Sequence, residues 1–452
     1  MLPDRPRPAP GVQPVGEGVD STRDAPPVGS RKICGDPPSR RGHTGSVTQE
    51  LLTIRSHKLV ASPRSALFAT GFRVFFLAGA LAALFPVALW LDTYTSSPSV
   101  VLPWSPAAWH GHEMVYGFAT AIVIGFLTTA VPKWTSTPAA SGRPLVVLFA
   151  TWLVARVSML FADALPAEWV LAASVAVYPV LLAIIARPIL STRNRRNYAF
   201  PVLLTALAAG DTLTHLPRLG ADAVWGHHGV RLGLYVLVMM IVVVGGRIIP
   251  AFTNAAMQRA GRGQVVPPPP RWDALTPVVV AAALLAQLGM APDGVAIPLL
   301  LVSAATLLAR TIHYQPWCAI KLPLLWILHV GYAWVPVGLL SLAAGRFGLS
   351  VPESTALHGL AAGAVGCMIL AMMARVSLGH TGRPLTLPRG MGAAFAAIAT
   401  GAALRVFGPA IAPAWFVEFV LAASVAWLAG FSMFLLRYTG MLVRPRVDGR
   451  PG

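Results

Sequence analysis

Apolar stretches of about 20 residues recur along the chain from Leu67 onward, separated by short segments rich in Pro, Gly and basic residues. An α-helix rises 1.5 Å per residue, so about 20 apolar residues cross the roughly 30 Å hydrocarbon core of a membrane. The pattern therefore predicts an all-α polytopic membrane protein with about twelve transmembrane helices. Numbered first to twelfth in chain order, the spans are expected at residues 67–91, 109–132, 144–162, 167–190, 197–217, 229–249, 273–291, 294–311, 321–344, 355–379, 390–411 and 413–437.

Residues 1–64 differ from the rest of the chain. They are rich in Pro, Gly, Arg and Ser and contain no apolar stretch, so they do not resemble a secretory signal. A segment of this composition cannot bury enough apolar surface to offset the entropy lost on ordering. We therefore expect a disordered extension at 1–64, a membrane domain at 65–440 and a short tail at 441–452.

The composition supports the membrane assignment. Hydrophobic residues make up 55% of the chain and charged residues only 12%, and the mean hydropathy is +0.65. Soluble proteins contain about 25% charged residues. The chain has too little polar surface to cover a water-soluble body, so its expected surroundings are a lipid bilayer.

The net charge of +18 is interpreted as membrane topology and not as nucleic-acid binding. A nucleic-acid-binding protein gathers its Lys and Arg on one face with aromatic residues among them. Here 19 of them lie in or beside the connections that follow the even-numbered spans, or in the tail. The opposite connections hold only Arg218, Arg231 and Arg346. Because Lys and Arg accumulate on the cytoplasmic side, both termini are expected in the cytoplasm.

The three cysteines, Cys34, Cys318 and Cys367, are too scattered for a disulfide framework. No two of them form a C-x-x-C pair, which excludes a zinc ribbon and covalent c-type haem attachment. Any metal chemistry must therefore come from other side chains.

The second, sixth and tenth spans share a pattern. Each begins with a histidine that is followed five residues later by a glycine. The three pairs are His112 with Gly117, His228 with Gly233, and His358 with Gly363. The second and tenth spans are also followed by the same tetrapeptide, Gly-Arg-Pro-Leu, at 142–145 and 382–385. A repeat every four helices predicts three four-helix units, with these spans in equivalent places about a pseudo-threefold axis.

The histidines are the candidates for chemistry. An ionisable residue costs about 2.5–3.5 kcal/mol at the centre of a span and is therefore a functional candidate by default. Neutral imidazole is the form that binds haem iron and copper. A single histidine at a span end is more often an interfacial residue bonded to water, but six are expected at the outer ends of spans. These six are His110, His112, His215, His227, His228 and His358.

Spacing along a helix narrows the choice of ligands. His110 and His112 are about 200° apart around a regular helix, so they cannot bind one metal from such a helix. If both are ligands, they serve different sites or the helix starts between them. Asp211 and His215 are four residues apart and share a face, the spacing at which a carboxylate orients an imidazole ligand. An ordinary polar pair at a helix end has the same spacing. We expect His112, His215 and His358 to converge near the outer side of the bundle.

Five segments of the chain resemble the NnrS family, and the resemblance runs from about residue 65 to 440. The segments are Gly-Phe-Arg-Val-Phe-Phe-Leu (71–77), Trp-His-Gly-His-Glu-Met-Val-Tyr-Gly-Phe (109–118), Gly-Gly-Arg-Ile-Ile-Pro-Ala-Phe-Thr-Asn (245–254), Leu-Leu-Trp-Ile-Leu-His-Val-Gly-Tyr-Ala-Trp (324–334) and Arg-Val-Ser-Leu-Gly-His-Thr-Gly-Arg-Pro-Leu (375–385). The resemblance implies a bacterial inner-membrane protein that contains haem and copper. It also implies a role in the nitric oxide response and denitrification, with nitric oxide or its metal adducts as the small-molecule partner.

The resemblance supplies no agreed ligand set, so the site residues are predicted from position. Cofactor binding is expected from His112, His215, His358, His329 and His380. Metal binding is expected from His110, His112, His227 and His228. Supporting roles around these ligands are expected for Asp211, Glu113, Arg247 and Arg375.

Several alternatives stay open at this point. The main one is a transporter or assembly factor for haem or copper, and a structural subunit without its own metal is another. A major facilitator is disfavoured because the second-to-third connection lacks a Gly-x-x-x-Asp signature. A fainter likeness to haem-copper oxidases rests on Trp-Gly-His-His-Gly (225–229), but the following span has no histidine pair. Catalytic turnover and oligomeric state are left open.

Overall fold

The computed structural model describes residues 66–93 and 104–450. All regular structure in these ranges is helical, and no strand occurs in them. Twelve of the described helices are long and apolar enough to cross a membrane, which confirms the predicted fold class. The disorder expected of residues 1–64 lies outside the described residues. The twelve spans are Gly71–Asp92, Pro106–Thr135, Arg143–Leu160, Ala167–Ser191, Arg195–Leu219, Val224–Arg259, Arg271–Gly289, Asp293–His313, Pro323–Arg346, Glu353–His380, Met391–Ile411 and Pro413–Leu442.

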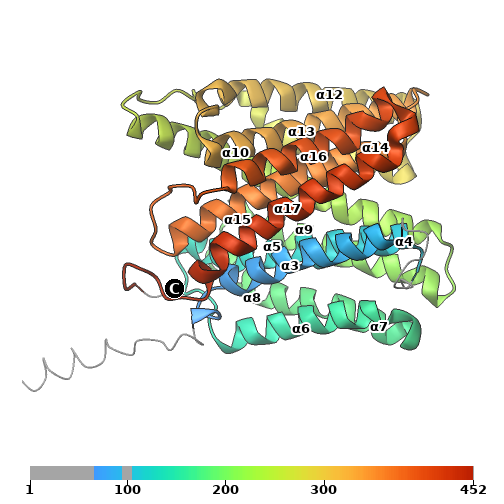
Figure 1. Cartoon of the computed structure of the whole chain (residues 1–452), viewed down its shortest axis with the longest axis horizontal. Coiled ribbons are helices and arrows are strands. Elements are labelled where there is room, and N and C mark those ends of the chain that lie inside the picture. Colours follow the sequence, from blue (N-terminus) through green and yellow to red (C-terminus); the bar gives the residue numbers. More distant parts are fainter. Residues whose placement is uncertain (1–65, 94–103, 451–452) are drawn as a thin grey trace, which may run out of the picture. The chain divides into compact units, whose positions relative to one another are not determined.

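The twelve spans contain fifteen α-helices, because the second, fourth and tenth spans each contain two (Figure 1). The α-helices are α3 (Gly71–Asp92), α4 (Pro106–His112), α5 (Thr120–Thr135), α6 (Arg143–Leu160), α7 (Ala167–Val175), α8 (Val177–Ser191), α9 (Ala199–His215), α10 (Val224–Arg259), α11 (Thr276–Leu285), α12 (Asp293–His313), α13 (Pro323–Arg346), α15 (Cys367–His380), α16 (Met391–Ile411) and α17 (Phe416–Leu442), besides the short α14 (Glu353–His358).

The predicted span ends agree with the structure to within a few residues except in the sixth span. Helix α10 has 36 residues, which makes it about 54 Å long, and it continues ten residues beyond the predicted end at 249. The extra turns contain Pro250 and polar residues such as Asn254 and Gln258. Hydropathy ends a span where polar residues begin, but the helix itself continues through them.

Two of the three spans in the predicted repeat share a break in helical geometry. In the second span, the π-helix η1 (Glu113–Ala119) begins directly after His112. In the tenth, the π-helix η8 (Gly359–Gly366) begins directly after His358. The sixth span, α10, is α-helical throughout. Stretches of π-helix are rare and are frequent at functional sites, so both histidines occupy unusual places.

The repeated glycines allow large side chains to approach these spans closely. A Cβ atom on Gly233 would lie 2.4 Å from the hydroxyl of Tyr116, and one on Gly363 would lie 2.4 Å from the Trp334 ring. Small residues let membrane helices pack closely. The glycine of each pair therefore serves helix packing, whatever its histidine does.

Consecutive spans pack against each other around a common centre. Helix α3 packs on α5 and on α17, α9 packs on α10, and α13 packs on η8 and α15 (Figure 1). The second, sixth and tenth spans, together with Phe76 of α3, line one apolar cavity of about 90 Å³. The three repeated spans thus meet at one place, while their superposition about a pseudo-threefold axis stays a prediction.

Candidate metal centre

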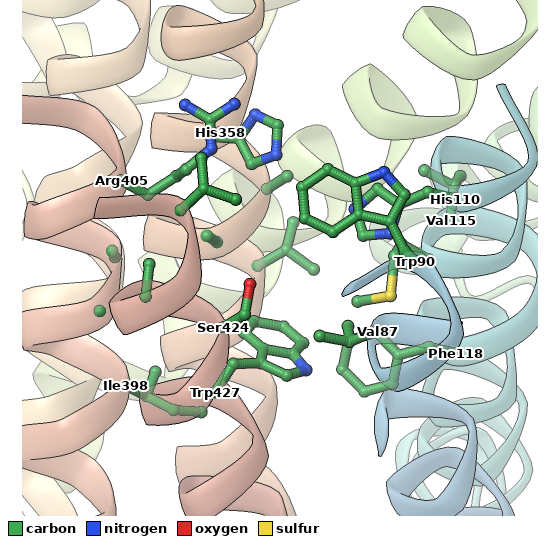
Figure 2. Close-up of a pocket in the computed structure, with 18 of the residues that line it drawn as sticks. Val87, Trp90, His110, Val115, Phe118, His358, Ile398, Arg405, Ser424 and Trp427 are labelled. Atoms are coloured by element: carbon green, nitrogen blue, oxygen red, sulfur yellow. The ribbon is translucent and has the colours of Figure 1, made fainter. Parts of the chain in front are cut away.

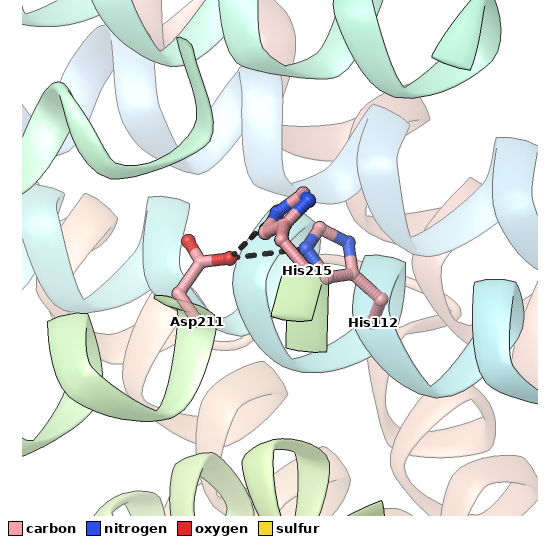
Figure 3. Close-up of side chains that lie close together, drawn as sticks. All are labelled: His112, Asp211 and His215. Atoms are coloured by element: carbon pink, nitrogen blue, oxygen red, sulfur yellow. Dashed lines mark hydrogen bonds and ion pairs between the residues drawn. The ribbon is translucent and has the colours of Figure 1, made fainter. Parts of the chain in front are cut away.

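Three buried side chains from two spans form a cluster (Figure 3). His112 is the last residue of α4, and Asp211 and His215 lie one turn apart on α9. Oδ1 of Asp211 lies 3.1 Å from Nε2 of His112 and 3.4 Å from Nε2 of His215. One nitrogen or oxygen atom from each residue lies within 4.8 Å of the others. Among the described residues, this is the group of histidine and acidic side chains with the spacing of a metal site.

The sequence places these atoms together partly through local geometry. Positions i and i+4 of an α-helix share a face, which brings Asp211 and His215 side by side. His112 arrives from a different span, and its orientation is set where α4 passes into η1. All three side chains are almost fully buried, with exposed fractions of 0%, 1% and 1%.

Asp211 is held by hydroxyl groups from the fourth span. Ser174 of α7 donates through its Oγ, which lies 3.0 Å from both carboxylate oxygens of Asp211. The hydroxyl of Tyr178 on α8 donates to Oδ2 over 3.1 Å. Bonds of this kind fix the orientation of a ligating carboxylate.

His112 is supported on its other side by a buried ion pair. Nδ1 of His112 lies 3.0 Å from Oε1 of Glu113. The same oxygen accepts a hydrogen bond of 2.5 Å from Arg156 of α6. A ligating histidine usually donates its second ring N–H to a carboxylate or carbonyl in this way.

The hydrogen bonding of His112 leaves the cluster one cation short. Both ring nitrogens face carboxylate oxygens, which only accept hydrogen bonds, whereas neutral imidazole has a single N–H. Asp211 and Glu113 carry two negative charges against the single positive charge of Arg156. A buried charge without a partner is costly. Either a proton on His112 or a metal cation next to Asp211 balances the cluster.

The atoms fit a metal ion of borderline softness. Ligand atoms about 2.0–2.2 Å from one metal lie roughly 2.9–3.4 Å apart at tetrahedral or right angles. The separations from Asp211 to the two imidazoles fall in this range. Among the described residues, Nδ1 of His215 has no hydrogen-bond partner, and its Nε2 has only the 3.4 Å contact with Asp211. Two imidazoles and a carboxylate suit copper, iron or zinc.

Trp104 closes the cluster from one side. Its ring stands edge-on to the imidazoles of His112 and His215, with centroids 5.3 and 5.4 Å away. The ring of Tyr116, which lies on η1, has its centroid 5.2 Å from that of the His112 ring. These aromatic walls limit access of water to the three polar side chains.

His358 does not belong to the cluster that His112 and His215 form with Asp211. It lines a different, mainly apolar cavity of about 100 Å³ together with His110, Trp90 and Arg405 (Figure 2). The ring of His110 stacks on Trp90 with centroids 4.6 Å apart. His110 and His112 therefore face different surroundings, as their spacing along the helix predicts.

The remaining predicted histidines are scattered. Nε2 of His329 lies 3.1 Å from the hydroxyl of Thr253, and Nε2 of His380 lies 3.0 Å from Nζ of Lys133. The exposed His227 bonds through Nδ1 to the carbonyl of Ala223 at 3.2 Å. His228 contacts the ring of Trp225. None of the four belongs to the cluster around Asp211.

Arg247 and Arg375 also lie with partners other than the metal cluster. Arg247 donates to Oδ1 of Asn197 and to the carbonyl of Arg196, each over 2.7 Å. The guanidinium of Arg375 sits 3.8 Å over the ring of Phe252. Of the four predicted supporting residues, only Asp211 and Glu113 take part in the cluster.

Sequence reasoning missed four contributors to the cluster. Arg156 carried a usable signal, because a charged residue within a span is a functional candidate by default. Trp104, Ser174 and Tyr178 carried none, since residues of these types are common at span ends and on helix faces. Their contribution depends on how the third and fourth spans pack against the fifth.

Comparison with known proteins identifies the family of the chain. The family model described as NnrS protein matches residues 66–446. A comparison with curated proteins finds no match. The match covers all twelve spans and most of the chain. The chain therefore belongs to the NnrS family.

Proposed function

We propose that the chain is a haem- and copper-binding inner-membrane protein of the nitric oxide response, with copper held by His112, Asp211 and His215. The observation that carries the proposal is the convergence of these three buried side chains, with ligand atoms within 4.8 Å of one another. Imidazole and carboxylate ligands suit copper. The family match supports the link to nitric oxide.

The roles of the chain's own residues follow from their contacts. A bound copper ion would supply a redox-active centre at which nitric oxide can be held. Glu113 orients His112 so that Nε2 is directed at the metal position, and Arg156 balances the charge of Glu113. Ser174 and Tyr178 hold the carboxylate of Asp211. Trp104 keeps water away from the centre.

The second cavity has the ligand chemistry for haem. Nδ1 of His358 donates to the carbonyl of Ser354 over 2.6 Å, so Nε2 retains its lone pair for iron. His110 lies on the same cavity, and Arg405 can neutralise an acidic group. The cavity, about 100 Å³, is smaller than the roughly 300 Å³ of the smallest ordinary ligand pockets. The cavity would therefore have to widen to hold haem.

The rival function is transport or assembly of haem or copper. Cargo of this kind needs a polar path that reaches both sides of the membrane. The cavity at the meeting point of the second, sixth and tenth spans is lined by apolar side chains and one glycine. This lining favours a bound cofactor over a transport path along that seam.

Metal analysis of the purified full-length protein tests the copper site. Wild-type protein reconstituted with copper is expected to hold about one ion per chain at the cluster, with nitrogen coupling in its electron paramagnetic resonance spectrum. His112→Ala should lose this ion, while His227→Ala, which changes an exposed histidine, should keep it. Equal copper in both variants would show that the cluster is a protonated salt bridge without metal.

The proposed orientation places both termini in the cytoplasm. Reporter fusions at Gly261, after α10, and at Gly220, between α9 and α10, distinguish the two sides. A cytoplasmic signal at Gly261 and an external signal at Gly220 are expected. The reverse pattern would exclude this orientation.

A further inference from the structure

The segment Gly-Gly-Arg-Ile-Ile-Pro-Ala-Phe-Thr-Asn at 245–254 has no part in either histidine site. It forms the C-terminal half of α10, on the side that the distribution of Lys and Arg assigns to the cytoplasm. A cavity of about 340 Å³ lies against it. The segment contributes Gly246, Arg247 and Pro250 to the lining of this cavity.

The charged residues that line this cavity are mainly basic. Three arginines face a single acidic residue, and His313 adds a further polar group. The arginines are Arg196, Arg247 and Arg310, and the acid is Asp273. Proline residues of the loop between α10 and α11 complete one wall. The cavity therefore carries more positive than negative charge before any ligand enters.

Arg310 is fixed and partly neutralised. Its Nε and one terminal nitrogen donate to the two carboxylate oxygens of Asp273 over 2.5 and 2.8 Å. A Cβ atom on Gly246 would lie 3.0 Å from the guanidinium of Arg310, so glycine is needed for this approach. The Arg310–Asp273 pair is thus a structural wall of the cavity.

The positive charges of Arg247 and Arg196 have no acid among the lining residues besides Asp273. Arg247 is oriented by hydrogen bonds to Oδ1 of Asn197 and to the carbonyl of Arg196, both neutral acceptors. Two hydrogen bonds use only part of the five N–H donors of a guanidinium. The side chain is thereby held in place with its charge uncompensated at short range.

The end of the same segment fixes the loop that forms the opposite wall. Oδ1 of Asn254 accepts from the backbone N–H groups of Val265 and Val266 over 3.0 and 2.8 Å. Its Nδ2 donates to the carbonyl of Val266 over 3.2 Å. Nε2 of His313 lies 3.2 Å from the carbonyl of Pro267. Residues 245–254 thus contribute to this cavity in three ways. Gly246 leaves room for Arg310, Arg247 provides positive charge, and Asn254 holds the loop that forms part of the wall.

We propose that this cavity binds a phosphate-bearing anion through Arg247 and Arg196. Guanidinium groups match phosphate oxygens in charge and geometry. Basic pockets between membrane helices on the cytoplasmic side bind lipid headgroups. A phosphodiester headgroup and free phosphate share this chemistry. The site is separate from both histidine sites and does not depend on the metal proposal.

Native mass spectrometry of the full-length protein in detergent tests this site with two probes, phosphatidylglycerol and inorganic phosphate. Arg196→Gln changes an exposed side chain and should leave folding intact. It is expected to weaken the anionic adduct about fivefold, and Arg247→Gln by at least as much. Arg437→Gln, the same charge change on an exposed position of α17, should leave the adduct unchanged.

The two probes distinguish a lipid phosphate headgroup from free inorganic phosphate as the ligand. A phosphatidylglycerol adduct that survives excess inorganic phosphate, and that phosphatidylcholine does not form, identifies a headgroup site. Displacement by inorganic phosphate, or a phosphate adduct alone, identifies a site for the free anion. The proposal is overturned if neither probe binds, or if Arg437→Gln weakens binding as much as Arg196→Gln does.

Discussion

His110 and His112 are two residues apart on one helix, yet their surroundings differ in kind. His112 contacts two carboxylates. One of them, that of Asp211, belongs to another span and lies almost one hundred residues away along the chain (Figure 3). His110 stacks on a tryptophan and faces a cavity that is mainly apolar (Figure 2). The same residue type at nearly the same depth thus serves one charged site and one apolar site.

The difference shows what determines the chemistry of a histidine in a membrane bundle. The two side chains are about 200° apart around the helix axis, so they face different spans. The span that each histidine faces supplies its contacting residues. Carboxylates beside an imidazole favour a positive charge at that place, either a proton or a metal ion. An apolar cavity favours the neutral imidazole, which can ligate a metal. The comparison can be tested by changing the partners and leaving the histidines in place.

The largest effect is expected from Asp211→Ala. This change removes the acceptor that faces Ser174, Tyr178 and Nε2 of His112, and these buried polar atoms lose the contact. Breaking a buried charged pair costs about 3–5 kcal/mol. Thermal unfolding in detergent should show a large loss of stability together with loss of the metal. A variant as stable as wild type would mean that the cluster contributes nothing to the fold.

Glu113→Gln should have the next largest effect, on metal affinity. The amide can still accept from Nδ1 of His112, but it no longer balances Arg156. Loss of such an outer partner weakens metal binding by about 10–100-fold. Competition with a copper chelator measures the change. An unchanged affinity would show that Glu113 serves only to neutralise Arg156.

Tyr178→Phe should have a smaller effect, because Ser174 still holds Asp211. A hydrogen bond to a charged group contributes about 1.5–3 kcal/mol, and part of this is retained by the remaining donor. We expect copper to bind less than tenfold more weakly in the chelator competition. A loss as large as that of Glu113→Gln would indicate that the hydroxyl itself contacts the metal.

The smallest loss of stability is expected from His358→Leu. The cavity is mainly apolar, so leucine replaces the imidazole with the loss of only the hydrogen bond to Ser354. That bond is worth about 1 kcal/mol. Copper at the cluster should be retained, while any haem absorbance should disappear. Loss of copper together with haem would show that the two sites act as one.

The sequence was sufficient for the spans and for the local part of the site. Hydropathy located all twelve helices, and the spacing of Asp211 and His215 placed them on one face. The approach of His112 to His215 was expected from their places at the outer ends of spans. The separate position of His358 was not expected, because it depends on the rotation of separate helices about their axes. The extra turns of α10 beyond 249 were missed because polar residues end a hydropathy peak but not a helix.

The π-helix after His112 has a consequence for descent within the family. A π-helix is an α-helix with an additional residue accommodated in its turn, and each residue of an α-helix advances about 100°. A deletion of one residue between 113 and 119 would restore an α-helix. The deletion would also rotate the preceding turn by about 100° about the helix axis, and His112 would then no longer face Asp211. A relative with a one-residue gap at this place would therefore be expected to lack the proposed metal site, even if it kept every histidine.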